Sequence, residues 1–258
     1  MKRQRNGLKV SNILVIGGSD PCSGAGIQAD IKTLSLLGFH SFSVVTVITV
    51  QNSFNFYKLH PLSLKLIEEQ LKVVLEDSRI EYVKTGILYS SKIVNLVAKY
   101  IKDKFVIVDP VFGSTLGGIF VDDSLIESYI KYIFPYTYLL TPNIQEAEII
   151  SERKIKNLED LKKACIVIKN MGVENILIKG GHFKEKVDVL YDGENFTYFK
   201  KESVKGEFHG TGCVFSSFIT GYLVKYGNLK KSIKYAKKRL TSLLKNPKII
   251  TGKINIII

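Results

Sequence analysis

The residues with the clearest chemical potential form a glycine-rich turn, Phe208-His209-Gly210-Thr211-Gly212-Cys213, directly before an apolar helical segment at 214–226. Glycines at a helix start leave backbone N–H groups pointing at one spot, and the helix dipole adds positive potential there. A cysteine in that field is expected to have a lowered thiol pKa. The turn therefore predicts an anion pocket containing a proton acceptor, which suits phosphoryl transfer. A plain helix cap with a packed cysteine is the alternative.

A second glycine-rich loop, GGSDPCSGAG at 17–26, follows the first apolar run. Its glycines permit a ligand to approach the backbone closely. It is not a P-loop, because no Gly-Lys-Ser/Thr ends it. It is not a dinucleotide fingerprint either, because Ala29 stands where the last glycine belongs. A simple turn remains the alternative, and Asp30 on the following helix, considered alone, is a cap or a surface acid.

Polar side chains also follow other apolar runs. Gln51 closes the run at 42–50, and its amide suits the edge of a heteroaromatic ring or caps the strand. Asp109 and Glu146 each follow a further strand, and carboxylates that leave room for phosphate oxygens suit Mg²⁺. Glu146 also fits a helix start, where the dipole favours an acid. Lys179, at the next strand end, would offset phosphate charge or is a solvated lysine.

These residues need a scaffold in which apolar, β-branched runs alternate with amphipathic helical patterns. Strands are expected at 12–16, 42–50, 82–84, 105–108, 136–140 and 175–179, with a hairpin of 187–191 and 196–200. Helices are expected at 27–37, 63–75, 91–102, 124–133, 157–171, 212–226 and 229–244. The pattern predicts an α/β fold with a mostly parallel sheet, helices on both faces and an antiparallel margin. Ligands of such sheets bind at the carboxyl ends of the strands.

Length and composition fit one domain at 12–245, with a basic segment at 1–11 and a tail at 246–258. The 258 residues are 45% hydrophobic and 24% charged, as in an ordinary globular protein. The tail is either an extra strand or a frayed end. No apolar run is long enough to cross a bilayer, and no apolar segment typical of a secretory signal follows the basic start. Three widely spaced cysteines favour reduced thiols, and hence the cytoplasm, over a disulfide framework.

The net charge of +13 raises the question of nucleic-acid binding. Lys and Arg are dense between 225 and 248, where no Asp or Glu occurs. Apolar residues recur there at helical spacing, so the charges form the outer face of an amphipathic helix. Stacking aromatics are sparse, with only Tyr226 and Tyr235. A solvated face is therefore favoured over a nucleic-acid site, and no membrane partner is expected.

Taken together, the motifs resemble the hydroxymethylpyrimidine/phosphomethylpyrimidine kinases of thiamine biosynthesis, within the ribokinase-like superfamily. The resemblance runs from about residue 13 to about 244 and rests on GGSDPCSGAGIQAD, VITVQNS, VKTGIL, DPV, TPNIQEAE, IKGGH and HGTGC in the order of the family. It implies a three-layer α/β/α fold. It also implies ATP- and Mg²⁺-dependent phosphorylation of 4-amino-5-hydroxymethyl-2-methylpyrimidine and of its monophosphate, with a homodimer left open.

The resemblance also implies residue roles. Cys213 takes the position of the catalytic base, within the anion loop of Gly210, Thr211 and Gly212. The pyrimidine pocket corresponds to Gln51, Gly18 and Asp30. Asp109 and Glu146 correspond to the Mg²⁺ region, and Lys179, Asn143 and Thr211 to the ATP site.

Two departures from the family pattern stand near the substrate loop: Cys22-Ser23 replaces the usual Ser-Gly, and Ile87 replaces a usual Met. The nearest rival is a pyridoxine/pyridoxal kinase on the same scaffold. Gln51 argues against it, because relatives directed to pyridoxal tend to carry an apolar residue there. A nucleic-acid-binding protein and a non-catalytic ligand sensor are more distant alternatives.

Overall fold

The computed structural model describes residues 12–113, 121–180, 187–200, 202, 204–247, 249–251 and 254–258. The expected basic segment at 1–11 lies outside these residues.

A nine-stranded sheet forms the centre of the molecule, in the order β3-β2-β1-β4-β5-β6-β7-β8-β9. The six inner strands are parallel, which confirms the expectation of a mostly parallel sheet: β1 (Asn12–Ser19), β2 (Ser41–Gln51), β4 (Ile80–Thr85), β5 (Phe105–Val108), β6 (Thr137–Leu140) and β7 (Asn175–Ile178). The hairpin of β8 (Val187–Tyr191) and β9 (Phe196–Lys200) forms the expected antiparallel margin. A second margin, β3 (Phe56–Pro61), was not predicted, because this largely exposed edge strand lacks an apolar run.

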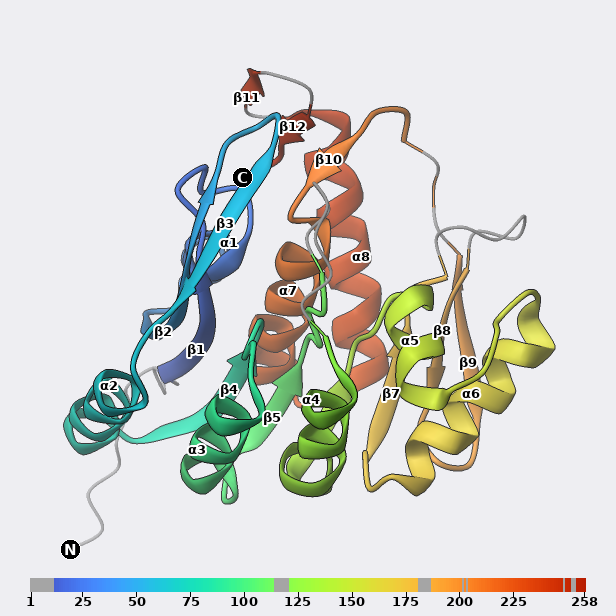
Figure 1. Ribbon diagram of the computed structural model, residues 1–258. Coiled ribbons are helices and arrows are strands. Elements are labelled where there is room, and N and C mark those ends of the chain that lie inside the picture. The colour runs from blue at the N-terminus through green and yellow to red at the C-terminus, as the bar shows by residue number, and fades with distance from the viewer. Residues whose placement is uncertain are drawn as a thin grey trace, which may run out of the picture.

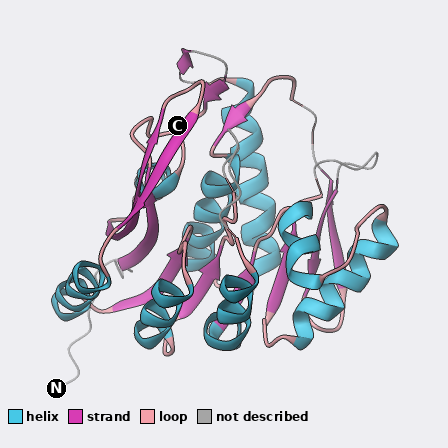
Figure 2. Ribbon diagram, in the orientation of Figure 1, coloured by secondary structure: helices cyan, strands magenta, loops and turns pink. Residues whose placement is uncertain are grey.

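Helices cover both faces of this sheet, as expected (Figures 1 and 2). One face carries α2 (Leu64–Asp77), α3 (Ser91–Ile101), α4 (Asp123–Ser128), α5 (Ile144–Ser151) and α6 (Leu158–Asn170). The other carries α1 (Gly26–Leu36), α7 (Thr211–Tyr226) and α8 (Leu229–Lys245). The continuous helix expected at 124–133 is instead α4 followed by a π-helical turn at Tyr129–Ile133. Helix α5 was not among the expected helices, and Asn143 caps its start.

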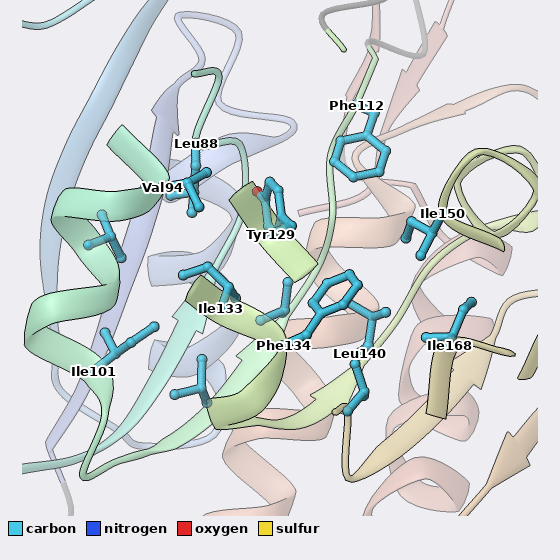
Figure 3. Close-up of a cluster of buried hydrophobic side chains, with 14 of the residues drawn as sticks. Leu88, Val94, Ile101, Phe112, Tyr129, Ile133, Phe134, Leu140, Ile150 and Ile168 are labelled. Atoms are coloured by element: carbon cyan, nitrogen blue, oxygen red, sulfur yellow. The ribbon is translucent and has the colours of Figure 1, made fainter. Parts of the chain in front are cut away.

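Each face has its own apolar core. Under α2 to α6, Tyr129 and Phe134 are among the largest fully buried side chains, and the Tyr129 ring meets Phe112 edge-on (Figure 3). Beneath α7 and α8, residues such as Phe218 and Ile233 pack on the opposite side of the sheet. Among the described residues, no helix is long and apolar enough to span a bilayer.

Helix α8 carries the basic stretch, and its apolar stripe is buried as expected at Leu229, Ile233, Ala236 and Leu244. Lys237 departs from the predicted solvated face. Its ammonium pairs with Asp188 of β8 and donates to the Phe199 carbonyl at 2.6 Å. Asp188 belongs to strand β8, so helical periodicity gave no sign of this contact.

The tail forms strands, which decides between the two alternatives left open for it. β11 (Ile249–Thr251) and β12 (Ile254–Ile256) are antiparallel, and β12 also pairs with β10 (Phe208–His209). Since β10 runs directly into the glycine turn, the C-terminal strands buttress that turn.

Candidate functional site

Backbone hydrogen bonds continue past the parallel strands and gather their following loops at one edge of the sheet. The N–H of Asp109 donates to Thr85, that of Thr141 to Val108 and that of Lys179 to Pro142, at 2.9–3.0 Å. A cavity of about 1460 Å³ opens at this edge. Every residue to which the sequence assigned a site role lines it: Gly18, Asp30, Gln51, Asp109, Asn143, Glu146, Lys179, Gly210, Thr211, Gly212 and Cys213.

The end of β1 shows why the first loop is rich in glycine. A Cβ on Gly18 would lie 2.8 Å from side-chain carbons of both Ile87 and Val47. The chain continues from β1 to β2 on one side of β1 and later returns to β4 on its other side. The loop after β1 therefore lies at the switch point of the sheet, where the order of the strands reverses. Gln51, at the end of β2, faces the same space, and its side chain helps to lower the pKa of the Asp20 carboxyl.

The glycine turn before α7 has the close approach that its sequence predicts. Gly210 adopts a left-handed conformation with φ of 72°, and a Cβ there would lie 1.8 Å from the carbonyl oxygen of Gly24. A Cβ on Gly212 would lie 3.3 Å from the Lys179 ammonium and 3.6 Å from Asp109. The first N–H groups of α7 are thus held between the first loop and a charged pair.

That charged pair is Asp109 and Lys179. The Lys179 ammonium lies 2.8 Å from Asp109 Oδ1, which also accepts the Thr141 hydroxyl at 3.1 Å. Ser216 of α7 donates to Oδ2 at 3.3 Å. Burial opposes ionisation of Asp109, but Lys179 and Lys84 outweigh it and lower the pKa of this carboxyl. Asp109 is therefore ionised at neutral pH.

Glu146 caps a helix and also faces the cavity. Asn143 and Glu146 form a reciprocal capping box at the start of α5, with hydrogen bonds of 2.8 and 2.9 Å. The cap considered as an alternative is therefore present, yet Glu146 also lines the cavity. Burial, together with the charge of Asp109, raises its pKa to about 7 despite Lys179. Two crowded carboxylates of this kind favour a cation between or beside them.

Lys84 and Asp30 form a buried ion pair that the sequence did not reveal. The Lys84 ammonium lies 2.9 Å from both carboxylate oxygens of Asp30, and neither side chain is appreciably exposed. Asp30 is thus neither the helix cap nor the surface acid that its position alone suggested. A lysine within an apolar strand must find a buried partner. This requirement indicated that Lys84 has a buried acidic partner, although nothing in the sequence identified Asp30 as that partner.

The expected lowering of the Cys213 thiol pKa is wrong for this structure. Cys213 is half-buried in the first turn of α7, and desolvation raises its pKa to about 12. Lys84 and the N–H of Gly26 act to lower the pKa, while Asp30 and Asp109 act to raise it. Burial and two carboxylates from other elements therefore outweigh the influence of Lys84 and of the Gly26 N–H, which favour the thiolate.

Asp20 joins the two glycine-rich loops and was missed from the sequence. It accepts backbone N–H groups from Cys22, Gly24 and Ala25 at 2.8–3.1 Å. The Nε2 atom of His209, which precedes the glycine turn, lies 3.1 Å from Asp20 Oδ2. Burial opposes ionisation, but hydrogen bonds from His209, Gln51 and the loop lower the pKa of Asp20 to about 2.

We expect Asp20→Asn to destabilise the protein by about 2 kcal/mol at pH 7. Because folding lowers this pKa, the ionised carboxylate stabilises the fold above about pH 4, and the stabilisation is lost as pH falls toward 2. Urea unfolding of both proteins at several pH values measures the effect. The difference between variant and wild type should shrink below pH 4, and a constant difference would contradict the assignment.

The Cys22-Ser23 departure has a backbone consequence. Ser23 adopts a φ of 56°, a left-handed conformation that favours glycine. We expect Ser23→Gly to stabilise the protein by roughly 0.5–1 kcal/mol, because relief of strain exceeds the entropy that glycine adds to the unfolded chain. Thermal melts measure this. Ser23→Ala keeps the Cβ and should not stabilise, so equal gains from both variants would rule out backbone strain as the cause.

The sheet, its two helical layers and the ligand cavity at the carboxyl edge define a ribokinase-like small-molecule kinase. The family described as phosphomethylpyrimidine kinase matches residues 20–256. The chain therefore belongs to the phosphomethylpyrimidine kinase family.

Individual relatives of two kinds, phosphomethylpyrimidine kinases and a pyridoxal kinase, are similar to this chain. The hydroxymethylpyrimidine/phosphomethylpyrimidine kinase of Aquifex aeolicus is 38% identical over 241 residues, which cover 91% of this chain and 94% of that protein. The crystal structure of phosphomethylpyrimidine kinase from Clostridium difficile has a TM-score of 0.80 at 36% identity, covering 90% and 98%. Pyridoxal kinase from Staphylococcus aureus in complex with pyridoxal has a TM-score of 0.87 at 29% identity, covering 95% and 92%.

Proposed function

We propose that this protein transfers the γ-phosphate of ATP to 4-amino-5-hydroxymethyl-2-methylpyrimidine, and then phosphorylates the monophosphate to the diphosphate. One observation carries the proposal. The glycine turn with Cys213, the Gly18–Gln51–Asp30 group and the Asp109–Glu146–Lys179 group all line a single cavity. Direct transfer requires the acceptor alcohol, the catalytic base and the ATP phosphates to lie next to one another. This cavity brings together side chains suited to each of these three groups.

In this proposal, the amides from Gly210 to Cys213 hold the oxygens of the transferring phosphoryl group. Lys179 offsets part of the negative charge, and such preorganised electrostatics supplies most of the acceleration in phosphoryl transfer. The substrate hydroxyl gives its proton to the Cys213 sulfur in its thiolate form, which is the minor form at neutral pH because burial raises the pKa of this thiol to about 12. Its oxygen forms a bond to the γ-phosphorus while the bond to the bridging oxygen breaks, and ADP leaves. Gln51 orients the pyrimidine ring, and Asp30, buried against Lys84, lines the same pocket.

The residues fit a magnesium ion. Mg²⁺ in such sites takes one or two carboxylates and completes its shell with water and phosphate oxygens. Asp109 and Glu146 are two buried carboxylates, and burial, with the charge of Asp109, raises the pKa of Glu146 to about 7, an effect that a bound cation would oppose. When bound, Mg²⁺ would neutralise phosphate charge.

The second candidate is a pyridoxine/pyridoxal kinase, favoured by the TM-score of 0.87 to the Staphylococcus aureus enzyme. ATP consumption measured side by side with hydroxymethylpyrimidine, its monophosphate and pyridoxal separates the two. We expect turnover of both pyrimidines at higher kcat/KM than pyridoxal. Preference for pyridoxal would replace the proposal by the alternative, and binding without ATP consumption would indicate a ligand sensor.

The ligands proposed here are small molecules rather than nucleic acid or membrane, and we also propose a homodimer. Apolar side chains gather on β2, β3 and their connecting turn, where Ile48, Val50, Phe54 and Tyr57 are each 44–57% exposed. Clustered exposed apolar residues mark interaction surfaces. Sedimentation velocity tests the association, and a monomer at micromolar concentration would contradict it. The free cysteines support a reducing, cytoplasmic location.

A further inference from the structure

Asp188 and Lys237 line the cavity, and the proposed mechanism gives neither of them a part. Asp188 lies on β8 and is only 5% exposed, and its carboxylate pairs with the Lys237 ammonium of α8. Both positions belong to apolar faces: Leu190, two residues along the strand, and Ile233, one helical turn before the lysine, are buried between the sheet and α8. An ion pair in such a place is often no more stabilising than apolar residues of similar size. Stability alone therefore gives no reason for this pair.

The carboxylate of Asp188 holds the backbone directly after Lys179. The ladder between β7 and β8 ends with the pair Ile178 and Val189. Beyond that pair, Oδ1 of Asp188 accepts the N–H of Gly180 at 3.1 Å, in a buried contact. A side chain thus continues the hydrogen bonding of the sheet at the point where the strand reaches the cavity.

Lys237 fixes the orientation of this carboxylate. Its ammonium pairs with Oδ2 of Asp188 and donates to the Phe199 carbonyl at 2.6 Å. Phe199 is the partner of Asp188 in the ladder between β8 and β9. The lysine therefore joins α8 to both strands of the hairpin and directs the other carboxylate oxygen toward Gly180.

As a result, hydrogen bonds hold Lys179 through the peptide groups on both of its sides. Its own N–H donates to the Pro142 carbonyl at 2.9 Å, and the N–H of Gly180 belongs to the next peptide group. A residue has only two soft backbone dihedrals, so fixing both adjoining peptide planes also fixes the direction in which its side chain leaves the chain. From there the Lys179 ammonium reaches Asp109 at 2.8 Å.

We propose that Asp188, oriented by Lys237, is a positioning residue that sets the direction from which the Lys179 ammonium meets the phosphate groups of ATP. This inference rests on the proposed function, in which Lys179 offsets phosphate charge. The hydrogen bond to Gly180 carries the effect, rather than the charge of Asp188, which the Lys237 ammonium offsets. A displacement of about 1 Å in a positioned group can cost about 100-fold in rate.

Two double variants isolate this hydrogen bond. Asp188→Leu/Lys237→Met (the leucine variant) and Asp188→Asn/Lys237→Met (the asparagine variant) both lack the ion pair, but only the asparagine keeps an acceptor for the Gly180 N–H. We expect the leucine variant to lower kcat for hydroxymethylpyrimidine about 10–100-fold, and the asparagine variant to remain within about threefold of wild type. Steady-state kinetics of the full-length proteins measures both values.

Thermal melts separate this role from a purely structural one. The two variants should have similar melting temperatures, because the apolar packing of leucine offsets the cost of the N–H left without an acceptor. Kinetics is measured well below both melting temperatures, so a loss of kcat is not a loss of folded protein. Equal kcat in the two variants would overturn the proposal. If the leucine variant does not fold, Asp188→Ala/Lys237→Met, which also lacks the acceptor, takes its place.

A Lys179→Met background tests the route. Because Asp188 acts through Lys179, the difference in kcat between the leucine and asparagine variants should disappear when this lysine is replaced. An undiminished difference in that background would also overturn the proposal.

Lys230→Met is the matched control for loss of an ion pair between the hairpin and α8. Lys230 lies two helical turns before Lys237, and its ammonium is 3.0 Å from Asp192, in the turn after β8. Both residues are described by the structure, and neither lines the cavity. The control should keep the wild-type kcat. A loss as large as that of the leucine variant would show that kcat follows the attachment of the hairpin to α8, and would contradict the role of the Gly180 contact.

If the wild-type protein phosphorylates no pyrimidine, the proposed function fails, and equilibrium binding of ATP takes the place of turnover. We then expect the leucine variant to bind ATP about tenfold more weakly than the asparagine variant, because Lys179 also faces the phosphates of bound ATP. That difference would leave the positioning role intact without the proposed function. Equal ATP affinities would overturn the positioning role as well.

Discussion

Replacing Cys213 by alanine is expected to lower kcat for hydroxymethylpyrimidine by about 10²–10⁴-fold, the range typical of a lost general base. Binding of ATP and of the pyrimidine should persist, because the amides of the glycine turn and the Gln51 side chain do not depend on the thiol. Steady-state kinetics and equilibrium binding measure the two effects separately. Cys165→Ala is the matched control, since it removes a thiol from the core of α6, away from the cavity.

The second phosphorylation should suffer less from Cys213→Ala than the first. Its acceptor is a phosphate oxygen, which is already anionic and requires little help from a base. Comparison of kcat for the alcohol and for its monophosphate in the same variant reveals the difference. Equal losses on the two substrates would argue against proton abstraction, and near wild-type turnover of the alcohol would refute the base assignment altogether.

Gly210→Ala is expected to reduce kcat by about 100-fold or more, the second of the two largest effects. The new methyl group would lie 1.8 Å from the Gly24 carbonyl oxygen, so the turn must move away from the first loop. A displacement of about 1 Å of a positioning group can cost about 100-fold in rate. Kinetics together with thermal melts separate the loss of activity from loss of fold.

Gly227→Ala provides a control with the same backbone penalty. Gly227 ends α7 with a φ of 59°, close to the left-handed φ of Gly210, but nothing lies within 4 Å of its added methyl group. It should lose about 1–2 kcal/mol of stability and keep its kcat. If Gly210→Ala were equally active, the amides of the glycine turn would not be the phosphoryl site.

Much of the fold could be predicted from the sequence because burial of a strand or helix leaves a local pattern of apolar residues along the chain. The inner strands are continuous apolar runs, α8 shows its buried face at helical spacing, and α7 is an apolar segment that is buried on most sides. Strand β3 and the π-helical turn after α4 escaped this reasoning. An edge strand buries little, and a π-helical turn depends on how side chains such as Tyr129 pack against Phe112 and Phe134.

The members of the candidate site were also accessible from sequence, since polar groups after parallel strands share one edge of the sheet. Their partners were not. Asp20 and His209 are 189 positions apart, and Asp30 and Lys84 are separated by 54. No local pattern connects such pairs, because the contacts exist only once the strands are ordered in the sheet.

The amino-acid sequence by itself determined the alternating layers, the glycine turns and the strand-end side chains, because each depends on neighbours along the chain. Only the tertiary structure decided the protonation of Cys213. Its own helix favours the thiolate, but burial, together with Asp30 and Asp109, which reach the thiol from α1 and the loop after β5, raises the pKa to about 12. Electrostatic energy depends on distances in space and on exclusion of water, and folding sets both.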